Sequence, residues 1–267
     1  AMAALEVEDN GCMAAVLAPI EEVQKIIDSV DDYVVLANVN SPVQSVIGGN
    51  VTAVEEAIEK FKDAGMQAVK IPVSHAFHTR IVAPAAEILR EMIQKTDLKI
   101  PALPIAANVT GEFYPQDRAE IANMLAEHIA SPVQFVKGVR TLYESGCRVF
   151  IESGPKRVLN SLATDILKEF EDATIIATNH PRKGGVESFH EALCQCYALG
   201  LGFEKPKQSP AAIEADAPKT AAAVDQSPVE VEDLTMPQKI TGSVVISGAG
   251  LGLPGRNHHV FSDDNIE

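Results

Sequence analysis

Residues 74–80 read S-H-A-F-H-T-R and hold the two side chains best suited to acid–base chemistry, His75 and His78. The segment follows a strand-like stretch that ends at Val73 and precedes a helical pattern that begins near residue 82. Loops at strand ends commonly carry catalytic groups, and an imidazole there can act as a general base near neutral pH. A histidine that only caps or packs is the alternative interpretation for either ring. The pair could share a helix face as metal ligands, but no further ligand cluster stands nearby, and no metal site is predicted.

A nucleophile for such a base is not evident in the sequence. Ser74 is adjacent to His75, but neighbouring side chains diverge in a strand, so adjacency alone is not expected to make a catalytic pair. The G-x-S-x-G pattern of a nucleophile elbow does not occur. If His78 is a base, the group that it activates is therefore not obvious in this chain.

A second motif, G-x-G-x-x-G, spans residues 250–255 behind the strand-like residues 243–247. This pattern can hold a dinucleotide when it opens a helix and an acidic ribose ligand follows about 20 residues later. Here Pro254 stands where the helix should begin, and the sequence ends before such an acidic residue. Glycines at a strand-to-loop transition are the favoured interpretation, and no bound cofactor is predicted.

The composition excludes several classes of protein. Of the 267 residues, 46% are hydrophobic and 22% are charged, which excludes a wholly disordered chain and a coiled coil. No apolar run reaches ~18 residues, so a membrane partner is not expected. A formal net charge of −15, without a run of lysine or arginine, argues against nucleic acid as a partner. Four scattered cysteines and an acidic N-terminus without a signal peptide favour the cytoplasm.

The first part of the chain shows a regular alternation of elements. Strand-like residues are predicted at 13–17, 33–39, 43–47 and 69–73. Two amphipathic helices are expected between them, one opened by Pro19 and one opened by a capping box of Thr52 and Glu55 and ended by Gly65. The order β-α-β-β-α-β predicts a ferredoxin-like subdomain over residues 11–73, with a four-stranded antiparallel sheet and both helices on one face.

The second part, residues 74–203, alternates helical patterns with short strands. Strands are predicted at 105–109, 148–151 and 174–178, and helices near 81–92, 121–129, 158–167 and 187–199. Such alternation indicates an α/β fold with a mostly parallel sheet. Residues 204–238 are rich in proline, alanine and acids and are predicted to form a linker. Residues 239–267 are expected to start another domain.

Several short motifs, taken together and in order, resemble the acyltransferase domain of polyketide and fatty acid synthases, which is similar to malonyl-CoA:acyl carrier protein transacylase. The motifs read Met13-Ala-Ala-Val16, Ala37-Asn-Val-Asn-Ser-Pro-Val-Gln44, His75-Ala-Phe-His78, Asn108-Val-Thr-Gly111, Ser131-Pro-Val-Gln134 and Glu152-Ser-Gly-Pro155. They cover residues 11–200. Residues 246–255 resemble, weakly, the opening of a ketosynthase domain.

The resemblance implies an α/β-hydrolase-like core with an inserted ferredoxin-like subdomain, and a ping-pong transfer. A serine takes the acyl group from coenzyme A and passes it to the phosphopantetheine thiol of an acyl carrier protein. It implies that His78 is the base and that the backbone carbonyl of Gln134 orients it. Phe77 is expected to line the acyl pocket, and the form His75-Ala-Phe-His78 accompanies malonyl units, with malonyl-CoA as substrate. Asn38 and Asn40 are expected on the face of the insert towards the cleft.

One feature departs from the family pattern. In the family, the serine elbow and the arginine that binds the malonyl carboxylate precede the inserted subdomain, whereas here nothing precedes Ala1. The chain is therefore expected to be the C-terminal part of an acyltransferase, with the nucleophilic serine outside it. The expected partners are the remaining part of the acyltransferase, neighbouring synthase domains and a carrier protein. The alternative hypothesis is a non-catalytic structural or docking segment of a multidomain synthase.

Overall fold

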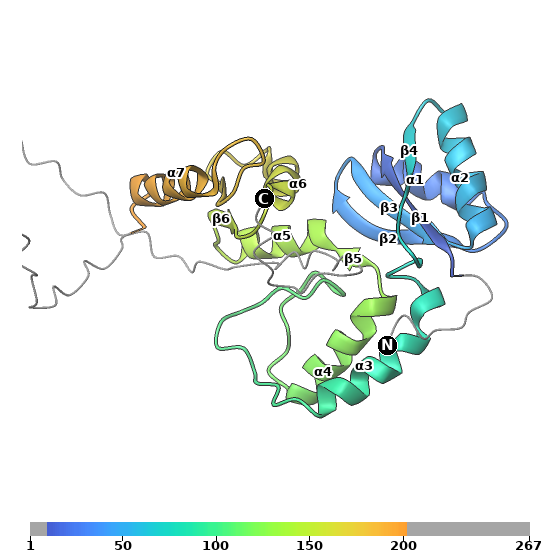
Figure 1. Ribbon diagram of the computed structural model, residues 1–267, viewed down its shortest axis with the longest axis horizontal. Coiled ribbons are helices and arrows are strands. Elements are labelled where there is room, and N and C mark those ends of the chain that lie inside the picture. The colour runs from blue at the N-terminus through green and yellow to red at the C-terminus, as the bar shows by residue number, and fades with distance from the viewer. Residues whose placement is uncertain (1–9, 202–267) are drawn as a thin grey trace, which may run out of the picture.

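The computed structural model describes residues 10–201 of the chain (Figure 1). The predicted linker at 204–238 and the predicted domain start at 239–267 lie outside the described residues. No helix within residues 10–201 is long and apolar enough to cross a membrane.

Residues 10–71 contain four strands and two helices in the predicted order. They are β1 (Cys12–Leu17), α1 (Ile20–Ile27), β2 (Val34–Ser41), β3 (Gln44–Gly49), α2 (Val51–Asp63) and β4 (Gln67–Ile71). The four strands lie in the spatial order β4-β1-β3-β2, and each neighbouring pair is antiparallel. The prediction of a four-stranded antiparallel sheet is therefore confirmed, although a fifth strand from the second part joins it.

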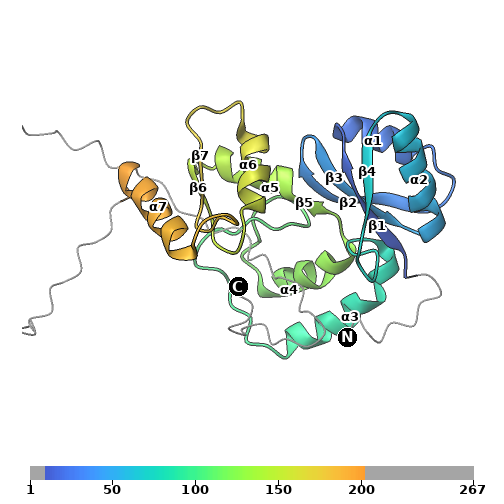
Figure 2. The same ribbon diagram turned by 45° about the horizontal axis from the view of Figure 1, so that its top comes forward.

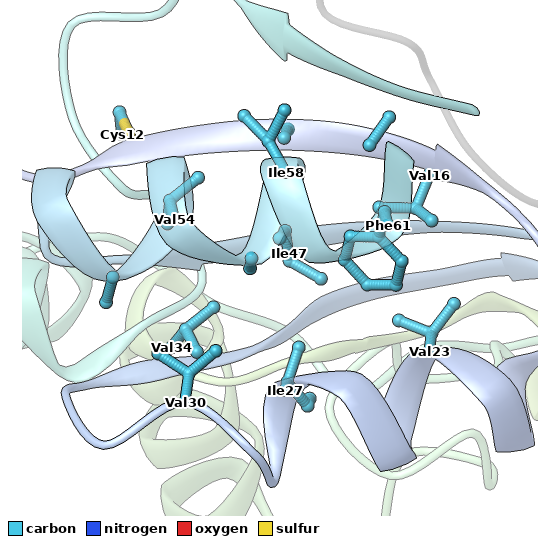
Figure 3. Packing of buried hydrophobic residues seen from close by; sticks show 14 of the residues in the cluster. Cys12, Val16, Val23, Ile27, Val30, Val34, Ile47, Val54, Ile58 and Phe61 are labelled. Carbon is cyan, nitrogen blue, oxygen red and sulfur yellow. The ribbon is translucent and has the colours of Figure 1, made fainter. Parts of the chain in front are cut away.

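One face of this sheet forms the largest apolar core of the described residues. Ala14 and Val16 of β1 point to the face that carries both helices, because side chains alternate along a strand. Val23 of α1 and Phe61 of α2 pack against them with no exposed surface (Figure 3). Both helices therefore cover the same face of the sheet, as their single apolar stripes predict.

The opposite face of the sheet is covered by the segment that follows β4. Met13, Ala37 and Val46 on this face form a second cluster with Ala76, and Phe77 packs against it. The histidine segment thus returns across the sheet directly after β4. This packing fixes the start of the loop that carries His75 and His78.

The second part, described here over residues 74–201, consists of short strands and seven helical segments. They are η2 (Arg80–Val82), α3 (Pro84–Gln94), α4 (Arg118–Glu127), η3 (His128–Ala130), β5 (Val133–Gln134), α5 (Phe135–Glu144), β6 (Val149–Glu152), α6 (Val158–Leu167), β7 (Thr174–Ala177) and α7 (Gly185–Ala198). β5 pairs in parallel with β2 and extends the first sheet, while β6 and β7 form a separate parallel pair. In both views α3 and α4 lie side by side (Figures 1 and 2). Of the mostly parallel sheet predicted for this part, the strands at 148–151 and 174–178 are observed as the parallel pair β6 and β7.

Two local predictions are wrong. Residues 105–109 do not form a strand, because the chain turns back at Gly111, with φ +70°, and leaves a single bridge between Ala106 and Phe113. The capping box at Thr52 is absent, because α2 begins at Val51 with Asn50 as its N-cap residue, and the Thr52 hydroxyl donates to Asp32 Oδ2 at 3.3 Å. Pro19 stands directly before α1 as its N-cap residue, which confirms the predicted start of this helix.

Candidate active site

The second half of the loop between β4 and η2, residues 76–79, is anchored at both of its ends. The Ala76 N–H donates to the Asn10 carbonyl at 2.9 Å, and the Ala76 side chain is fully buried. Thr79 is 1% exposed, and its hydroxyl donates to the Ala76 carbonyl at 2.6 Å and accepts from the Ile81 N–H at 3.3 Å. The threonine thereby caps η2 and closes the turn. These contacts hold the two residues between them, Phe77 and His78, in one backbone conformation.

His78 adopts a backbone conformation that is uncommon for a residue with a side chain, with φ +60°. Its N–H donates to the Ile129 carbonyl at 2.9 Å, and its Nδ1 atom lies 3.0 Å from the His128 carbonyl. A carbonyl oxygen can only accept, so Nδ1 must carry the proton in this hydrogen bond. The remaining nitrogen, Nε2, then holds the free lone pair that a general base needs.

The acceptor for His78 is therefore not the one that the family resemblance implies. Within residues 10–201, the carbonyl hydrogen-bonded to His78 Nδ1 belongs to His128, not to Gln134. The physical reason is the anchoring of the His78 backbone to Ile129, which brings the imidazole against the first residue of η3. The chemical role assigned to a backbone carbonyl is the same in both cases, but a different residue supplies it.

Gln134 lies close to the asparagine-rich strand instead. It ends β5, and its N–H donates to the Asn108 carbonyl at 2.7 Å. β5 pairs in parallel with β2, with Asn38 opposite Val133 and Val39 opposite Gln134. Half-buried Asn38 and Asn40 therefore belong to the strand beside Gln134. Three of the motifs that resemble the acyltransferase family, at residues 37–44, 108–111 and 131–134, therefore meet at this edge of the sheet.

His75 has a different environment from His78. Its side chain is buried, and its Nδ1 atom lies 2.9 Å from the Ser74 hydroxyl oxygen. The expectation that these two neighbouring side chains diverge is wrong, because residues 74–79 form bends and a turn rather than a strand. The geometry therefore favours a structural role for His75, next to the half-buried ring of Phe77, whose centroid lies 6.1 Å from that of His75.

His128 is a site residue that sequence reasoning missed. Its ring lies 5.2 Å from the ring of His78, centroid to centroid, with a 33° tilt. Burial, and secondly repulsion by His78, lower the pKa of His128 below its usual value of 6.5. Its Nε2 atom is buried and has no hydrogen-bond partner within the described residues. The sequence did carry a signal, since His128 stands three residues before the motif that begins at Ser131.

Glu152, the first residue of the motif Glu152-Ser-Gly-Pro155, has a structural role. Its two carboxylate oxygens accept from the backbone N–H groups of Leu159 and Asn160, at 3.2 and 2.6 Å. A carboxylate at this position satisfies the free donors of the first turn of α6 and complements the helix dipole. The Glu152 carbonyl also accepts from the N–H of Thr178 at 3.0 Å, which connects the end of β6 to the end of β7.

Within residues 10–201, no group of three or more potential metal ligands is present.

Comparison with known proteins places these features in context. Residues 2–201 match the Acyl transferase domain family. The chain is 33% identical over 204 residues to a polyunsaturated fatty acid synthase polypeptide of Thraustochytrium sp., covering 73% of this chain and 7% of that protein. It is 34% identical over 171 residues to malonyl CoA-acyl carrier protein transacylase of Bacillus subtilis, covering 62% of this chain and 54% of that protein. The chain therefore spans about half the length of that transacylase.

Solved structures give the same result at the level of the fold. The acyltransferase domain from the second module of the salinomycin polyketide synthase matches with a TM-score of 0.64 and 28% identity, over 72% of this chain and 45% of that one. The malonyl CoA-acyl carrier protein transacylase from Clostridium perfringens matches with a TM-score of 0.65 and 32% identity, over 75% of this chain and 62% of that one. The mixed α/β arrangement described above is thus that of solved acyltransferase domains.

Proposed function

Since the chain belongs to the Acyl transferase domain family, whose members include malonyl-CoA:acyl carrier protein transacylases, we propose that it forms part of a carrier-protein acyltransferase. The reaction is transfer of a malonyl unit from coenzyme A to the phosphopantetheine thiol of an acyl carrier protein, in polyketide or fatty acid synthesis. The observation that carries the proposal is the hydrogen bond from His78 Nδ1–H to the His128 carbonyl, which leaves Nε2 basic.

In this mechanism His78 serves as the base in two successive transfers. Nε2 takes the hydroxyl proton of a serine as its oxygen attacks the thioester carbonyl of malonyl-CoA. The imidazolium then gives that proton to the departing thiolate of coenzyme A. In the second half, Nε2 takes the proton of the carrier thiol, which attacks the acyl-serine, and returns the proton to the serine oxygen. The serine is supplied by polypeptide outside residues 1–267.

The same proposal assigns the parts of the chain. Residues 11–73 form a ferredoxin-like subdomain inserted into an α/β-hydrolase-like core, of which residues 74–203 are the C-terminal part. The strand order β4-β1-β3-β2 supports the first assignment, and the parallel pair β6–β7 supports the second. Residues 204–238 would then link this enzyme to a further domain at 239–267. The partners are the carrier protein, the rest of the acyltransferase and neighbouring synthase domains.

Substrate contacts are proposed for the residues around His78. Phe77 lines the acyl pocket beside the base, with His75 behind it. Asn38 and Asn40 face the cleft from β2, and Gln134 lies on the neighbouring strand β5. The parallel pairing of β2 with β5 supports this grouping, because it brings the asparagines and Gln134 to one edge of the sheet.

The test compares His78→Ala with the parent protein in the complete synthase polypeptide that contains residues 1–267. Acyl-enzyme formation from malonyl-CoA is followed by intact-protein mass spectrometry, and transfer to the carrier protein is measured separately. Loss of general-base catalysis should slow both steps by about 10²–10⁴-fold. His190→Ala, at an exposed histidine on α7, is the matched control and should retain full rates. Equal rates for His78→Ala and the parent would contradict the proposal, and a parent protein that never forms an acyl-enzyme would favour the structural-segment alternative.

A further inference from the structure

We infer that two loops at the carboxyl ends of β6 and β7, residues 153–157 and 178–184, form one anion-binding surface that takes the phosphate groups of coenzyme A. The inference rests on the proposed function only in taking a coenzyme A thioester as the acyl donor. It assigns the part of the donor that is remote from the reacting carbonyl to residues outside the His78 site. Its effects can therefore be measured by binding as well as by activity.

The two loops concentrate positive charge in a chain that is strongly acidic. The formal net charge is −15, yet residues 153–157 (S-G-P-K-R) and 178–184 (T-N-H-P-R-K-G) contain lysine and arginine but no aspartate or glutamate. The cations are Lys156, Arg157, Arg182 and Lys183, all of them exposed. A negatively charged protein repels a polyanionic donor over most of its surface, so such a donor needs a local positive surface in order to bind.

The fold holds the two loops side by side. β6 and β7 are parallel neighbours, so both loops leave the same end of the strand pair. The Glu152 carbonyl accepts from the Thr178 N–H and from the Thr178 hydroxyl, at 3.0 and 2.9 Å, where the loops begin. Further along, the Lys156 N–H donates to Asn179 Oδ1 at 3.0 Å. The cations of both loops therefore belong to one surface, although the sequence shows no long run of lysine or arginine.

Three of the four cations form no ion pair within residues 10–201. They are Lys156, Arg157 and Arg182, whereas Lys183 pairs with Glu191 at 2.5 Å. Arg157 Nη2 donates to the amide oxygen of Asn160 at 2.9 Å, which orients the guanidinium without neutralising its charge. Cations that no carboxylate neutralises are the groups that bind phosphate oxygens through charge-assisted hydrogen bonds.

The loops also stand where ligands bind in α/β folds. In open parallel sheets, ligands lie beyond the carboxyl ends of the strands. Gly154 in one loop and Gly184 in the other leave open space, since a Cβ atom added to either would meet nothing within 4 Å. A phosphate group can therefore approach the backbone as well as the side chains. α6, which follows the first loop, packs against β2, so one helix connects this surface to the strand that carries Asn38 and Asn40.

The test measures binding of coenzyme A to the complete synthase polypeptide that contains residues 1–267, by isothermal titration calorimetry. Lys156→Gln and Arg182→Gln each remove one unpaired cation at an exposed position and should raise Kd about 3–10-fold, and the double variant should raise it about 10–100-fold. Lys25→Gln removes the same charge from the exposed face of α1 and is the matched control, with an unchanged Kd. Pantetheine, which carries no phosphate, should bind the parent and the double variant equally. An unchanged Kd for coenzyme A in the double variant, or an equal loss with pantetheine, would overturn the inference.

Kinetics then separate coenzyme A from the carrier protein, whose phosphopantetheine also holds a phosphate. In the complete synthase polypeptide, the double variant should raise KM for malonyl-CoA about 10–100-fold with kcat unchanged, and malonyl-pantetheine should react equally with parent and variant. A rise confined to KM for the carrier protein would contradict the assignment to coenzyme A. If coenzyme A binding depends on Lys156 and Arg182 but no malonyl unit is transferred, the phosphate surface stands and the proposed function falls. If malonyl transfer proceeds and the double variant binds coenzyme A like the parent, the proposed function stands and the phosphate surface falls.

Discussion

The Nδ1 atom of His78 lies 3.0 Å from the carbonyl oxygen of His128, a residue 50 positions further along the chain. This contact joins the loop after the antiparallel sheet to the turn that follows α4. The parallel pairing of β2 with β5, a few residues beyond that turn, joins the same two parts a second time. The His78 ring is therefore held by the connection between the two parts of the chain, and anything that separates them should change the state of that ring.

The lowered pKa of His128 predicts a pH dependence of stability. The folded protein binds a proton at His128 less readily than the unfolded chain, whose histidines titrate near 6.5. The free energy of unfolding should therefore fall as the pH drops below about 6.5, and this contribution should be fully present above it. Urea unfolding of the parent and of His128→Gln at pH values of about 7.5 and about 5.5, on either side of the unfolded pKa, measures it. A stability loss of equal size in both proteins would show that other groups cause it.

Loss of the buried hydroxyl of Thr79 should destabilise the loop that carries His78. Thr79→Val keeps the shape of the side chain but removes the donor to the Ala76 carbonyl. The expected loss is about 1–3 kcal/mol of unfolding free energy, because the carbonyl is left without its partner. Thr96→Val is the matched control, since the exposed Thr96 also donates to a carbonyl three residues back, at 2.7 Å. Chemical denaturation should show a change within about 0.5 kcal/mol for the control; equal effects at both sites would refute the role of the buried hydroxyl.

The sheet and its two covering helices could be predicted from the sequence because their signal is local. Ala14 and Val16 alternate with Met13 along one strand, and Phe61 lies on a single apolar stripe, so each element shows its buried face by itself. The wrong strand at 105–109 also has a physical reason. A β-branched, apolar run becomes a strand only where a partner ladder exists, and the turn at Gly111 removes the partner after one bridge.

The site could be predicted only in part, for a related reason. Residue type and position after a strand single out His78, but its acceptor depends on a contact across 50 residues that no local pattern encodes. The family resemblance implies Gln134 for that role, and the structure has His128 in it. The Ser74–His75 hydrogen bond could not be predicted from strand geometry, because the chain bends at these residues.

Gly49 should tolerate no side chain, although its φ angle is unremarkable for any residue. A Cβ atom there would lie 2.1 Å from the Tyr33 carbonyl oxygen and 2.7 Å from Val34 Cα, both of them backbone atoms of the neighbouring strand segment. Gly49→Ala should cost at least about 1–3 kcal/mol, because the pairing of β2 with β3 has to open. Gly184→Ala, before α7, meets nothing within 4 Å and should change stability by less than about 1 kcal/mol. Similar melting temperatures for the two variants would contradict this account of the sheet.

The last prediction concerns which acyl group the proposed enzyme accepts. Phe77 directly precedes His78, the proposed base, and its half-buried ring packs against the sheet cluster of Met13, Ala37 and Val46, so it has little freedom to move away. If the ring lies beside the α-carbon of the bound acyl group, an added α-methyl group has to be accommodated against it. Overpacking by one methyl group costs about 1–3 kcal/mol, which corresponds to a preference of about 10–200-fold for malonyl over methylmalonyl. Phe77→Ser removes the ring and should reduce this ratio.

The measurement is competition between malonyl-CoA, methylmalonyl-CoA and acetyl-CoA in the complete synthase polypeptide. Phe113→Ser, which removes a half-buried ring in a separate cluster, is the control for a general loss of packing. A parent enzyme that prefers methylmalonyl, or a ratio that Phe77→Ser leaves unchanged, would exclude Phe77 as the residue that selects the substrate.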